Sequence, residues 1–370
     1  MKKKIKLNRY DTFSPMLEFK NYVESFKKCR KKTAWKESIQ RFWNDFTPNV
    51  FKIIERLDKK KIRLKKPKEF LINERGKPRF IRSIPIEERI FVKVLCEKII
   101  QPVIVPQLIY NNSACIKGKG TLFAKQQLKK HLHSYFINYG YKGYALTVDF
   151  SKFFQNIDHD ILYAKLFKLF KDENIRWLLK LIIDSFGDKG LSLGSELSQL
   201  LATWFPNDLD HFIKEKLHIE YYGRYMDDFY LIHHDLDYLK YCLKEIKRVC
   251  GDLKITINER KTKFHCVENG FKFLQCNFFI TPKGQVIVKP SKKNSLRLRI
   301  KLRKYKRMLD AGRIDYRDVR NTYESWKGHL KGSNCYKMKR NMERFYLDLF
   351  ELDLNNKTCY TLPKRIRKGA

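Results

Sequence analysis

The segment Glu220–His234 (EYYGRYMDDFYLIHH) contains two adjacent carboxylates, Asp227 and Asp228, between two short apolar runs that are rich in aromatic residues. Runs of this kind predict two strands joined by a tight turn, with the carboxylates at the tip of the hairpin. Fixed negative charge at such a tip can hold Mg²⁺ between a protein and a phosphate group. An adjacent acidic pair is also typical of a solvated turn, so the rest of the chain must decide between the two interpretations.

The composition favours a polyanionic partner. Among the 370 residues, Lys and Arg total 79 against 40 Asp and Glu, which gives a formal net charge of +39 at pH 7. Such an excess is typical of proteins that bind nucleic acid. No apolar run approaches the roughly 20 residues that span a bilayer, and the start MKKKIKLNRYDTF lacks the apolar segment of a secretory signal. The nine cysteines form no CxxC pair, and we expect free thiols in a reducing cytoplasm instead of a zinc site or disulfide framework.

A third carboxylate, Asp149, ends the apolar run Tyr144–Asp149 (YALTVD), which is predicted to be a buried strand. Carboxylates at the ends of two strands can meet side by side in one antiparallel sheet. Two Mg²⁺ ions held there would activate a 3′-hydroxyl and stabilise a leaving pyrophosphate. The alternative role for Asp149 is to cap the amphipathic helix expected over Asp160–Phe170.

The remaining pattern predicts an alternation of helices and short strands. Helices are expected over residues 1–60, 87–104, 177–186 and 195–216, strands flanking the turns at 73–78 and 282–284, and a basic, largely helical region from Ser291 onward.

Seven segments in this order resemble the prokaryotic reverse transcriptases. They are Arg79–Pro85 (RFIRSIP), Lys117–Thr121 (KGKGT), Asp149–Asp158 (DFSKFFQNID), Leu193–Gln199 (LGSELSQ), Tyr225–Asp228 (YMDD), Asn258–Lys263 (NERKTK) and Phe273–Gln275 (FLQ). The resemblance implies an α+β right-hand polymerase with fingers, a ferredoxin-like antiparallel palm and a helical thumb. It also implies dNTP substrates and two Mg²⁺ ions, with Mn²⁺ as a substitute. The corresponding domains are an N-terminal helical extension at 1–60, fingers and palm at 61–289, and a basic helical thumb at 290–370.

The resemblance assigns roles to individual catalytic residues. Asp149 and Asp227 match the metal ligands, and Asp228 matches a third, less essential carboxylate. Phe150 matches a position whose backbone carbonyl often completes the metal shell. Lys261 resembles a lysine that protonates the leaving pyrophosphate, and the alternative is an exposed lysine in a basic loop.

Other residues match positions that bind the nucleotide. Phe154 matches the steric gate that excludes a 2′-hydroxyl, and either Phe153 or Phe154 is expected in the core. Lys77 and Arg79 lie where the fingers place cations on the triphosphate, and Arg82 is a competing candidate. The alternative for these cations is a solvated hairpin surface.

The segment Leu193–Gln199 departs from most of the family, which has Gln at the position of Leu193 and Pro at that of Gln199. An apolar residue there resembles the enzymes of diversity-generating retroelements and related lineages. Gly194 would let the backbone approach the nascent base pair closely. We expect Leu193 to relax base selection.

Two further segments resemble parts of the family that hold nucleic acid. Phe273 and Leu274 resemble the primer grip, although the family usually has Gly where Gln275 stands. Ser325–His329 (SWKGH), followed by Ser333-Asn334, resembles segments of diversity-generating and defence-associated enzymes, and Trp326 is alternatively a core residue. The expected thumb carries a dense series of cations that could follow a phosphate backbone: Arg297, Arg299, Lys301, Arg303, Lys304 and Arg307.

The function implied by this resemblance is an RNA-directed DNA polymerase that copies a specific structured RNA into cDNA. Two settings remain open. One is antiphage defence with a non-coding RNA, and the other is a diversity-generating retroelement with adenine-directed errors and a small basic accessory protein. The alternative is a catalytically quiet RNA-binding protein on a reverse transcriptase scaffold. No membrane partner is expected, and the sequence carries no signal for the oligomeric state.

Overall fold

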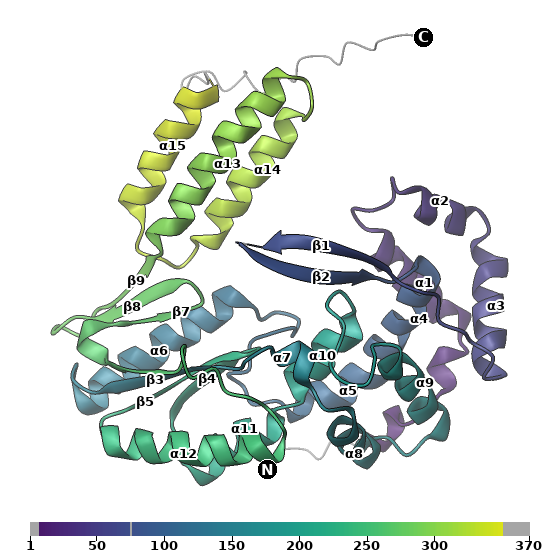
Figure 1. The fold of residues 1–370 in the computed structure, drawn as a ribbon, viewed down its shortest axis with the longest axis horizontal. Helices are drawn as coiled ribbons and strands as arrows, with labels where there is room; N and C mark the ends of the chain where they lie inside the picture. Colours follow the sequence, from purple (N-terminus) through teal and green to yellow (C-terminus); the bar gives the residue numbers. More distant parts are fainter. Residues whose placement is uncertain (1–6, 75, 351–370) are drawn as a thin grey trace. The chain divides into compact units, whose positions relative to one another are not determined.

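The computed structural model describes residues 7–74 and 76–350 (Figure 1). Contacts divide the chain into two compact units. The first comprises Met1–Gly120, Leu146–Leu231 and Asp235–Lys263, and the second comprises Thr121–Ala145, Ile232–His234 and Phe264–Ala370.

The first unit begins with short helices packed through aromatic rings. They are η1 (Leu7–Tyr10), η2 (Ser14–Met16), α1 (Phe19–Arg30), α2 (Glu37–Asn44) and α3 (Phe46–Asp58). Phe26 of α1 is buried and stacks on Trp43, with ring centroids 5.4 Å apart. Aromatic pairs of this kind add to the energy of area burial, so they hold the three helices together. The expectation of helix near the N-terminus is confirmed over these residues.

A two-stranded antiparallel hairpin follows, formed by β1 (Lys68–Glu74) and β2 (Lys77–Ser83). Its position confirms the predicted turn between two strands. The chain then enters the helical stretch α4 (Ile86–Val94), the π-helix η3 (Leu95–Ile100), α5 (Gln101–Ile104) and η4 (Val105–Gln107). The predicted helix over 87–104 is therefore confirmed, with one π-helical segment inside it.

The central four-stranded sheet has the order β4-β5-β3-β6, formed by β4 (Tyr221–Tyr225), β5 (Asp228–His233), β3 (Tyr144–Asp149) and β6 (Lys263–Cys266). Strands β4 and β5 are joined by the two-residue turn Met226-Asp227, as the sequence predicts. Because β3 lies next to β5, its carboxyl end reaches this turn. The backbone N–H of Phe150 donates to the carbonyl of Asp227 at 3.2 Å.

Helices complete the first unit: α7 (Phe153–Asn156), α8 (His159–Leu169), α9 (Glu173–Asp184), α10 (Glu196–Trp204), α11 (Asn207–His211), the π-helix η5 (Phe212–Lys216) and α12 (Leu236–Asp252). The helix predicted over 195–216 is thus three segments, divided next to Pro206. The capping alternative for Asp149 is wrong, because Asp149 is the last residue of β3. The cap of α8 is Asp158, whose side chain accepts from Ile161 N–H at 3.0 Å.

The second unit contains α6 (Thr121–Tyr139), η6 (Val267–Asn269), an antiparallel sheet and a helical bundle. The sheet is formed by β7 (Phe271–Phe273), β8 (Cys276–Ile280) and β9 (Val286–Pro290), and the bundle by α13 (Lys292–Asp310), α14 (Tyr316–His329) and α15 (Tyr336–Phe350). Trp326 lies in the apolar core of the bundle, which confirms the core alternative for this residue. The predicted thumb residues 351–370 lie outside the described part of the chain.

The loop before α15 is tied to the sheet of the same unit. The backbone N–H of Asn334 donates to the Val288 carbonyl at 2.7 Å, and its side-chain oxygen accepts from Val288 N–H at 2.9 Å. The Lys125 ammonium of α6 donates to the His329 carbonyl at 3.1 Å. The segment from His329 to Asn334 therefore has a structural function in the second unit.

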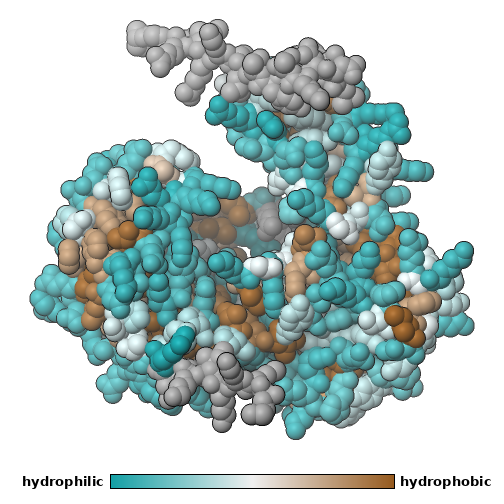
Figure 2. Space-filling view, turned by 180° about the vertical axis from the view of Figure 1, so that it is seen from behind, coloured by the Kyte–Doolittle hydropathy of each residue, from teal (hydrophilic) through white to brown (hydrophobic). Residues whose placement is uncertain are grey.

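Hydrophilic side chains predominate over the face seen in Figure 2, with apolar residues between them. The eight cysteines in the described ranges are all free thiols, as expected. Within those ranges, no helix has both the length and the apolar character needed to cross a membrane.

Candidate active site

Three carboxylates meet where β3 ends beside the β4–β5 turn. Asp149 is buried at the end of β3, Asp227 lies in the turn, and Asp228 begins β5 and hydrogen-bonds to Asp149. Burial raises the pKa of the Asp228 carboxyl to about 7, and the Asp149 hydrogen bond and the charges of Asp227 and Asp149 add to the rise. Burial, with the charge of Asp149, also raises the pKa of Asp227. Ionisation of Asp227 and Asp228 is therefore disfavoured in this cluster, and a further bound cation would favour it.

Two side chains from the segment after α12 contact Asp149. The Lys261 ammonium lies 2.6 and 2.7 Å from the two carboxylate oxygens, and the Asn258 amide donates to one of them at 3.2 Å. The backbone N–H of Asn258 also donates to the Asp149 carbonyl at 2.8 Å. Asn258 received no role from the sequence, although it begins the NERKTK segment. The structure thus places Lys261 at the carboxylates and adds Asn258 to the site.

A cavity of about 560 Å³ within the first unit is lined by two of these carboxylates, Asp149 and Asp227. Its walls include residues from the β1–β2 hairpin, the β3 end and the loop before α10. The lining residues with predicted roles are Arg79, Arg82, Asp149, Phe150, Phe154, Leu193, Asp227 and Lys261. One cavity therefore unites cations, carboxylates and an aromatic ring that are up to 182 positions apart (Arg79 to Lys261).

The two hairpin arginines differ in their surroundings. The positive charge of Arg79 lowers the pKa of Asp227, against the effect of burial. In contrast, the Arg82 guanidinium donates to Glu69 at 2.7 Å and to the Phe186 carbonyl at 3.1 Å. Its backbone N–H donates to the Leu193 carbonyl at 3.1 Å. Arg82 therefore fixes the hairpin to its surroundings, whereas the charge of Arg79 acts on Asp227. The side chain of Lys77 lies outside the described part.

The phenylalanines after β3 separate into core and cavity residues. Phe150 and Phe153 are buried, with ring centroids 5.1 Å apart. Phe154 is partly exposed and lines the cavity, and its carbonyl accepts from Leu191 N–H at 2.6 Å. Of the pair Phe153 and Phe154, Phe153 is the core residue.

The segment from Leu193 to Gln199 is divided between two cavities. Leu193 lines the cavity above the carboxylates, whereas Gly194 and Gln199 line a second one of about 480 Å³. Gly194 has a φ of +115°, and a Cβ there would lie 2.7 Å from the Arg82 carbonyl. Only glycine fits this close approach of the hairpin.

Phe273 and Leu274 belong to the second unit, at the β7–β8 hairpin. Phe273 is buried, and Leu274 and Gln275 form the turn with φ values of +45° and +64°. A two-residue turn with both φ values positive favours Gly or Asn. A glycine at the position of Gln275 would therefore adopt this turn without strain.

Divalent cations prefer carboxylate oxygens, so the donor set Asp149, Asp227 and Asp228 fits such an ion. In the described residues, no three His, Cys, Asp or Glu side chains already converge at metal-ligand spacing.

Comparison with known proteins points to one family. Residues 63–278 match the family described as reverse transcriptase (RNA-dependent DNA polymerase). This match, with the helix-rich architecture and antiparallel sheets, confirms the expected right-hand polymerase fold. No curated protein matches the chain significantly.

Two similar solved structures are telomerases. One is from Candida albicans in complex with a fragment of telomeric RNA, with 14% identity and a TM-score of 0.48, covering 79% of this chain and 61% of the telomerase chain. The other is apo telomerase from Candida tropicalis truncated from its C-terminal domain, with 15% identity and a TM-score of 0.45, covering 60% and 55% of the two chains. The chain thus spans less than two thirds of either telomerase chain.

Proposed function

Because the chain belongs to the reverse transcriptase (RNA-dependent DNA polymerase) family, we propose that it copies a structured RNA into cDNA from dNTPs. The observation that carries this proposal is the meeting of Asp149, Asp227 and Asp228 at the end of β3, where Asp149 and Asp227 line the cavity. Arg79 and Phe154 line the same cavity. Carboxylates, a cation and an aromatic ring around one space suit a nucleoside triphosphate.

Asp149, Asp227 and Asp228, with the Phe150 carbonyl, would hold the divalent ions that the family generally uses, and we propose two Mg²⁺, with Mn²⁺ as a substitute. When bound, such ions lower the pKa of a 3′-hydroxyl and neutralise charge on the transferred phosphate.

The other residues of the cavity bind and orient the nucleotide. Arg79 offers planar donors that suit bidentate contact with phosphate oxygens, and Lys77 would add a second cation from the same hairpin. Phe154 fills the space beside the sugar and excludes a 2′-hydroxyl, which selects dNTPs. Lys261 holds a proton at Nζ beside the carboxylates and can donate it to the leaving pyrophosphate.

Template and primer require further contacts. We assign the nascent base pair to Leu193, with Gly194 and Gln199 beside it, and the primer to the Phe273-Leu274 hairpin. The α13 cations are mostly exposed, as a surface that follows a phosphate backbone requires.

We place this activity in the cytoplasm of a prokaryote, where the free thiols are stable. The product would serve antiphage defence or a diversity-generating retroelement, in the latter with a small basic accessory protein. The two settings differ in the errors of the cDNA.

The test is to sequence all RNA and DNA that co-purifies with the native protein, with Asp227→Asn and with the control Asp237→Asn. Asp237 is a highly exposed carboxylate on α12, paired with Lys240 at 2.7 Å, so its loss changes charge equally without touching the site. One dominant RNA in all three samples, with complementary DNA only in wild type and Asp237→Asn, supports the proposal. Adenine-biased errors indicate a diversity-generating element, and faithful or repetitive DNA indicates defence.

The alternative, a catalytically quiet RNA-binding protein, predicts RNA in every sample and DNA in none. It conflicts with the retention of three adjacent carboxylates, since burial raises the pKa of Asp227 and Asp228 and a cationic ligand would offset that cost.

A further inference from the structure

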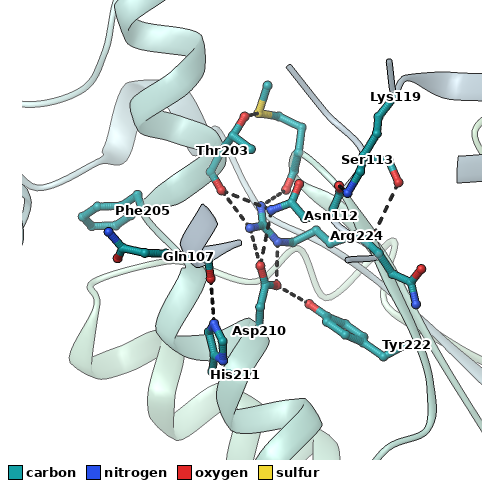
Figure 3. A network of polar contacts seen from close by, with 12 residues as sticks. Gln107, Asn112, Ser113, Lys119, Thr203, Phe205, Asp210, His211, Tyr222 and Arg224 are labelled. Carbon is teal, nitrogen blue, oxygen red and sulfur yellow. Dashed lines mark hydrogen bonds and ion pairs between the residues drawn. The ribbon is translucent and has the colours of Figure 1, made fainter. Parts of the chain in front are cut away.

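A buried ion pair lies beneath the carboxylate turn (Figure 3). Arg224 is the next-to-last residue of β4, and its side chain and that of Asp210 on α11 are both fully inaccessible to solvent. The guanidinium contacts the carboxylate through two atoms: Nε lies 2.7 Å from one oxygen and Nη2 lies 2.6 Å from the other. This bidentate geometry is specific to arginine, because a lysine ammonium has no planar fork.

Two further donors anchor Asp210, one from β4 itself and one from the segment between η4 and α6. The Tyr222 hydroxyl donates to Asp210 at 2.6 Å, and burial raises the pKa of Tyr222 well above its ordinary value, so the hydroxyl keeps its proton. The Asn112 amide approaches the other oxygen at 3.4 Å. Asp210 is therefore held in place independently of Arg224, and it fixes the orientation of the guanidinium.

The same guanidinium also holds the catalytic turn. Its Nη1 donates to the carbonyl of Met226 at 2.9 Å. This carbonyl belongs to the peptide bond between Met226 and Asp227, so its orientation sets the direction in which the Asp227 side chain leaves the backbone. Met226 has a φ of +59°. A non-glycine residue in this left-handed conformation is strained, so the turn needs an external contact to persist.

A third contact extends the network to α10. Arg224 Nη2 donates to the carbonyl of Thr203 at 2.8 Å, and the Thr203 hydroxyl donates to the carbonyl of Gln199 at 2.8 Å and approaches the Met226 sulfur at 3.6 Å. One side chain thus joins the end of α10, Asp210 of α11 and the turn. Because α10 contains Gln199, which we assign to the surroundings of the nascent base pair, the network links that segment to Asp227.

We propose that Arg224, oriented by Asp210, is a positioning residue that fixes the Met226-Asp227 peptide so that the Asp227 carboxylate faces Asp149 for cation binding. This inference rests on the proposed function, because cation binding by Asp227 is part of the proposed polymerase reaction. A buried ion pair by itself adds little net stability compared with well-packed apolar residues. The contact with the strained turn explains why a guanidinium, and not merely an apolar side chain of similar volume, occupies this position.

The test compares Arg224→Lys with Leu179→Ala in the full-length protein. Lysine keeps the buried charge opposite Asp210 but cannot reach Asp210, Thr203 and Met226 together. Leu179 is fully buried in α9, so its truncation provides a control that lowers stability elsewhere. Three quantities are measured for each protein: the melting temperature, direct Mn²⁺ binding by electron paramagnetic resonance with template–primer present, and the Mg²⁺ dependence of kcat and of KM for dNTP.

For folded Arg224→Lys, we expect Mn²⁺ affinity to fall about 10-fold and kcat about 10- to 100-fold. Losses of this size correspond to one or two charge-assisted hydrogen bonds. The KM for dNTP stays near wild type, and Leu179→Ala keeps wild-type Mn²⁺ affinity at a lowered melting temperature. Wild-type Mn²⁺ affinity in Arg224→Lys overturns the inference. Equal losses of Mn²⁺ affinity in Arg224→Lys and Leu179→Ala overturn it too.

Two outcomes require a separate reading: an Arg224→Lys variant that does not fold, and a wild-type protein that incorporates no dNTP. If Arg224→Lys does not fold, Tyr222→Phe carries the test: it removes one donor to Asp210 without touching the turn, and unchanged Mn²⁺ affinity in that variant overturns the inference. If wild type incorporates no dNTP, the proposed function fails. The Mn²⁺ titration then decides the positioning role alone, with weaker binding in Arg224→Lys supporting it and equal binding overturning it.

Discussion

Replacement of Asp228 by Asn should stabilise the metal-free protein at alkaline pH. Burial and the neighbouring carboxylates raise the pKa of Asp228 from 3.8 to about 7. As pH rises through this window, the unfolded chain releases a proton that the folded protein still binds, so the free energy of unfolding falls. Above pH 7 this loss is complete, and below about pH 4 it is absent. Asn does not ionise, so Asp228→Asn removes the penalty.

The size of the effect follows from the pKa. A rise from 3.8 to about 7 corresponds to about 4 kcal/mol when the group is fully ionised in both states. Asp228 is only partly buried, and solvent screens such interactions. We therefore expect a gain of about 2 kcal/mol at pH 8, which shrinks to less than half of that at pH 5.

The assay is urea unfolding of wild type, Asp228→Asn and the exposed control Asp237→Asn, each at pH 5 and pH 8 in EDTA. Asp237→Asn should change little at either pH, because its carboxylate is largely solvated. With Mg²⁺ in place of EDTA, wild type should recover more stability than Asp228→Asn, because it retains the carboxylate. A gain in Asp228→Asn that is the same at both pH values, or a loss at pH 8, would refute the reasoning.

Three further changes test other parts of the molecule. Phe154→Ala should raise ribonucleotide use relative to dNTP about 10- to 100-fold in single-nucleotide incorporation; unchanged selectivity would remove the steric-gate assignment. Leu193→Gln should lower misincorporation opposite template adenine, measured by sequencing the cDNA, and an equal error rate would contradict the assignment. Gln275→Gly should raise the free energy of unfolding of the second unit by about 1 kcal/mol, because Gln275 has a φ of +64°. A lower melting temperature would show that the Gln275 side chain makes a stronger contribution than its backbone strain.

The elements that the sequence predicted are those with a strong local signal. Strand β3 has a continuous apolar run, and the β4–β5 turn is marked by two carboxylates between aromatic runs. Helix α6 had no such signal and was not predicted, because its buried residues include Lys125 and Gln127 beside Leu128. Strand β6 was not predicted either, since it is short and begins with exposed residues. Tertiary contacts decide both elements.

The predicted site residues required knowledge of which distant segments meet. The family resemblance brought Asp149 and Asp227 together in advance, and the structure places both at one cavity. The resemblance could not distinguish the role of Arg79 from that of Arg82, because the structural role of Arg82 depends on its contacts with Glu69 and the Phe186 carbonyl. Arg224 was overlooked although an arginine inside an apolar strand is a signal by itself, since a buried charge requires a partner. The partner, Asp210, is identified only by the fold.

The locally unfavourable features of the active site lie at one turn, and a single network of buried polar groups stabilises that turn. Asp227 in the turn and Asp228 directly after it are crowded by Asp149, and Met226 has a left-handed backbone. Neither feature would persist in an isolated hairpin. Arg224 joins the Met226 carbonyl to Asp210. Both side chains of this ion pair are fully buried, so water cannot replace their contacts. Strained segments persist where the surrounding structure over-determines them. The polar network around Arg224 therefore has to be rigid for the three carboxylates to remain close. The same crowding that lowers the stability of the turn creates the negative charge that binds a cation there.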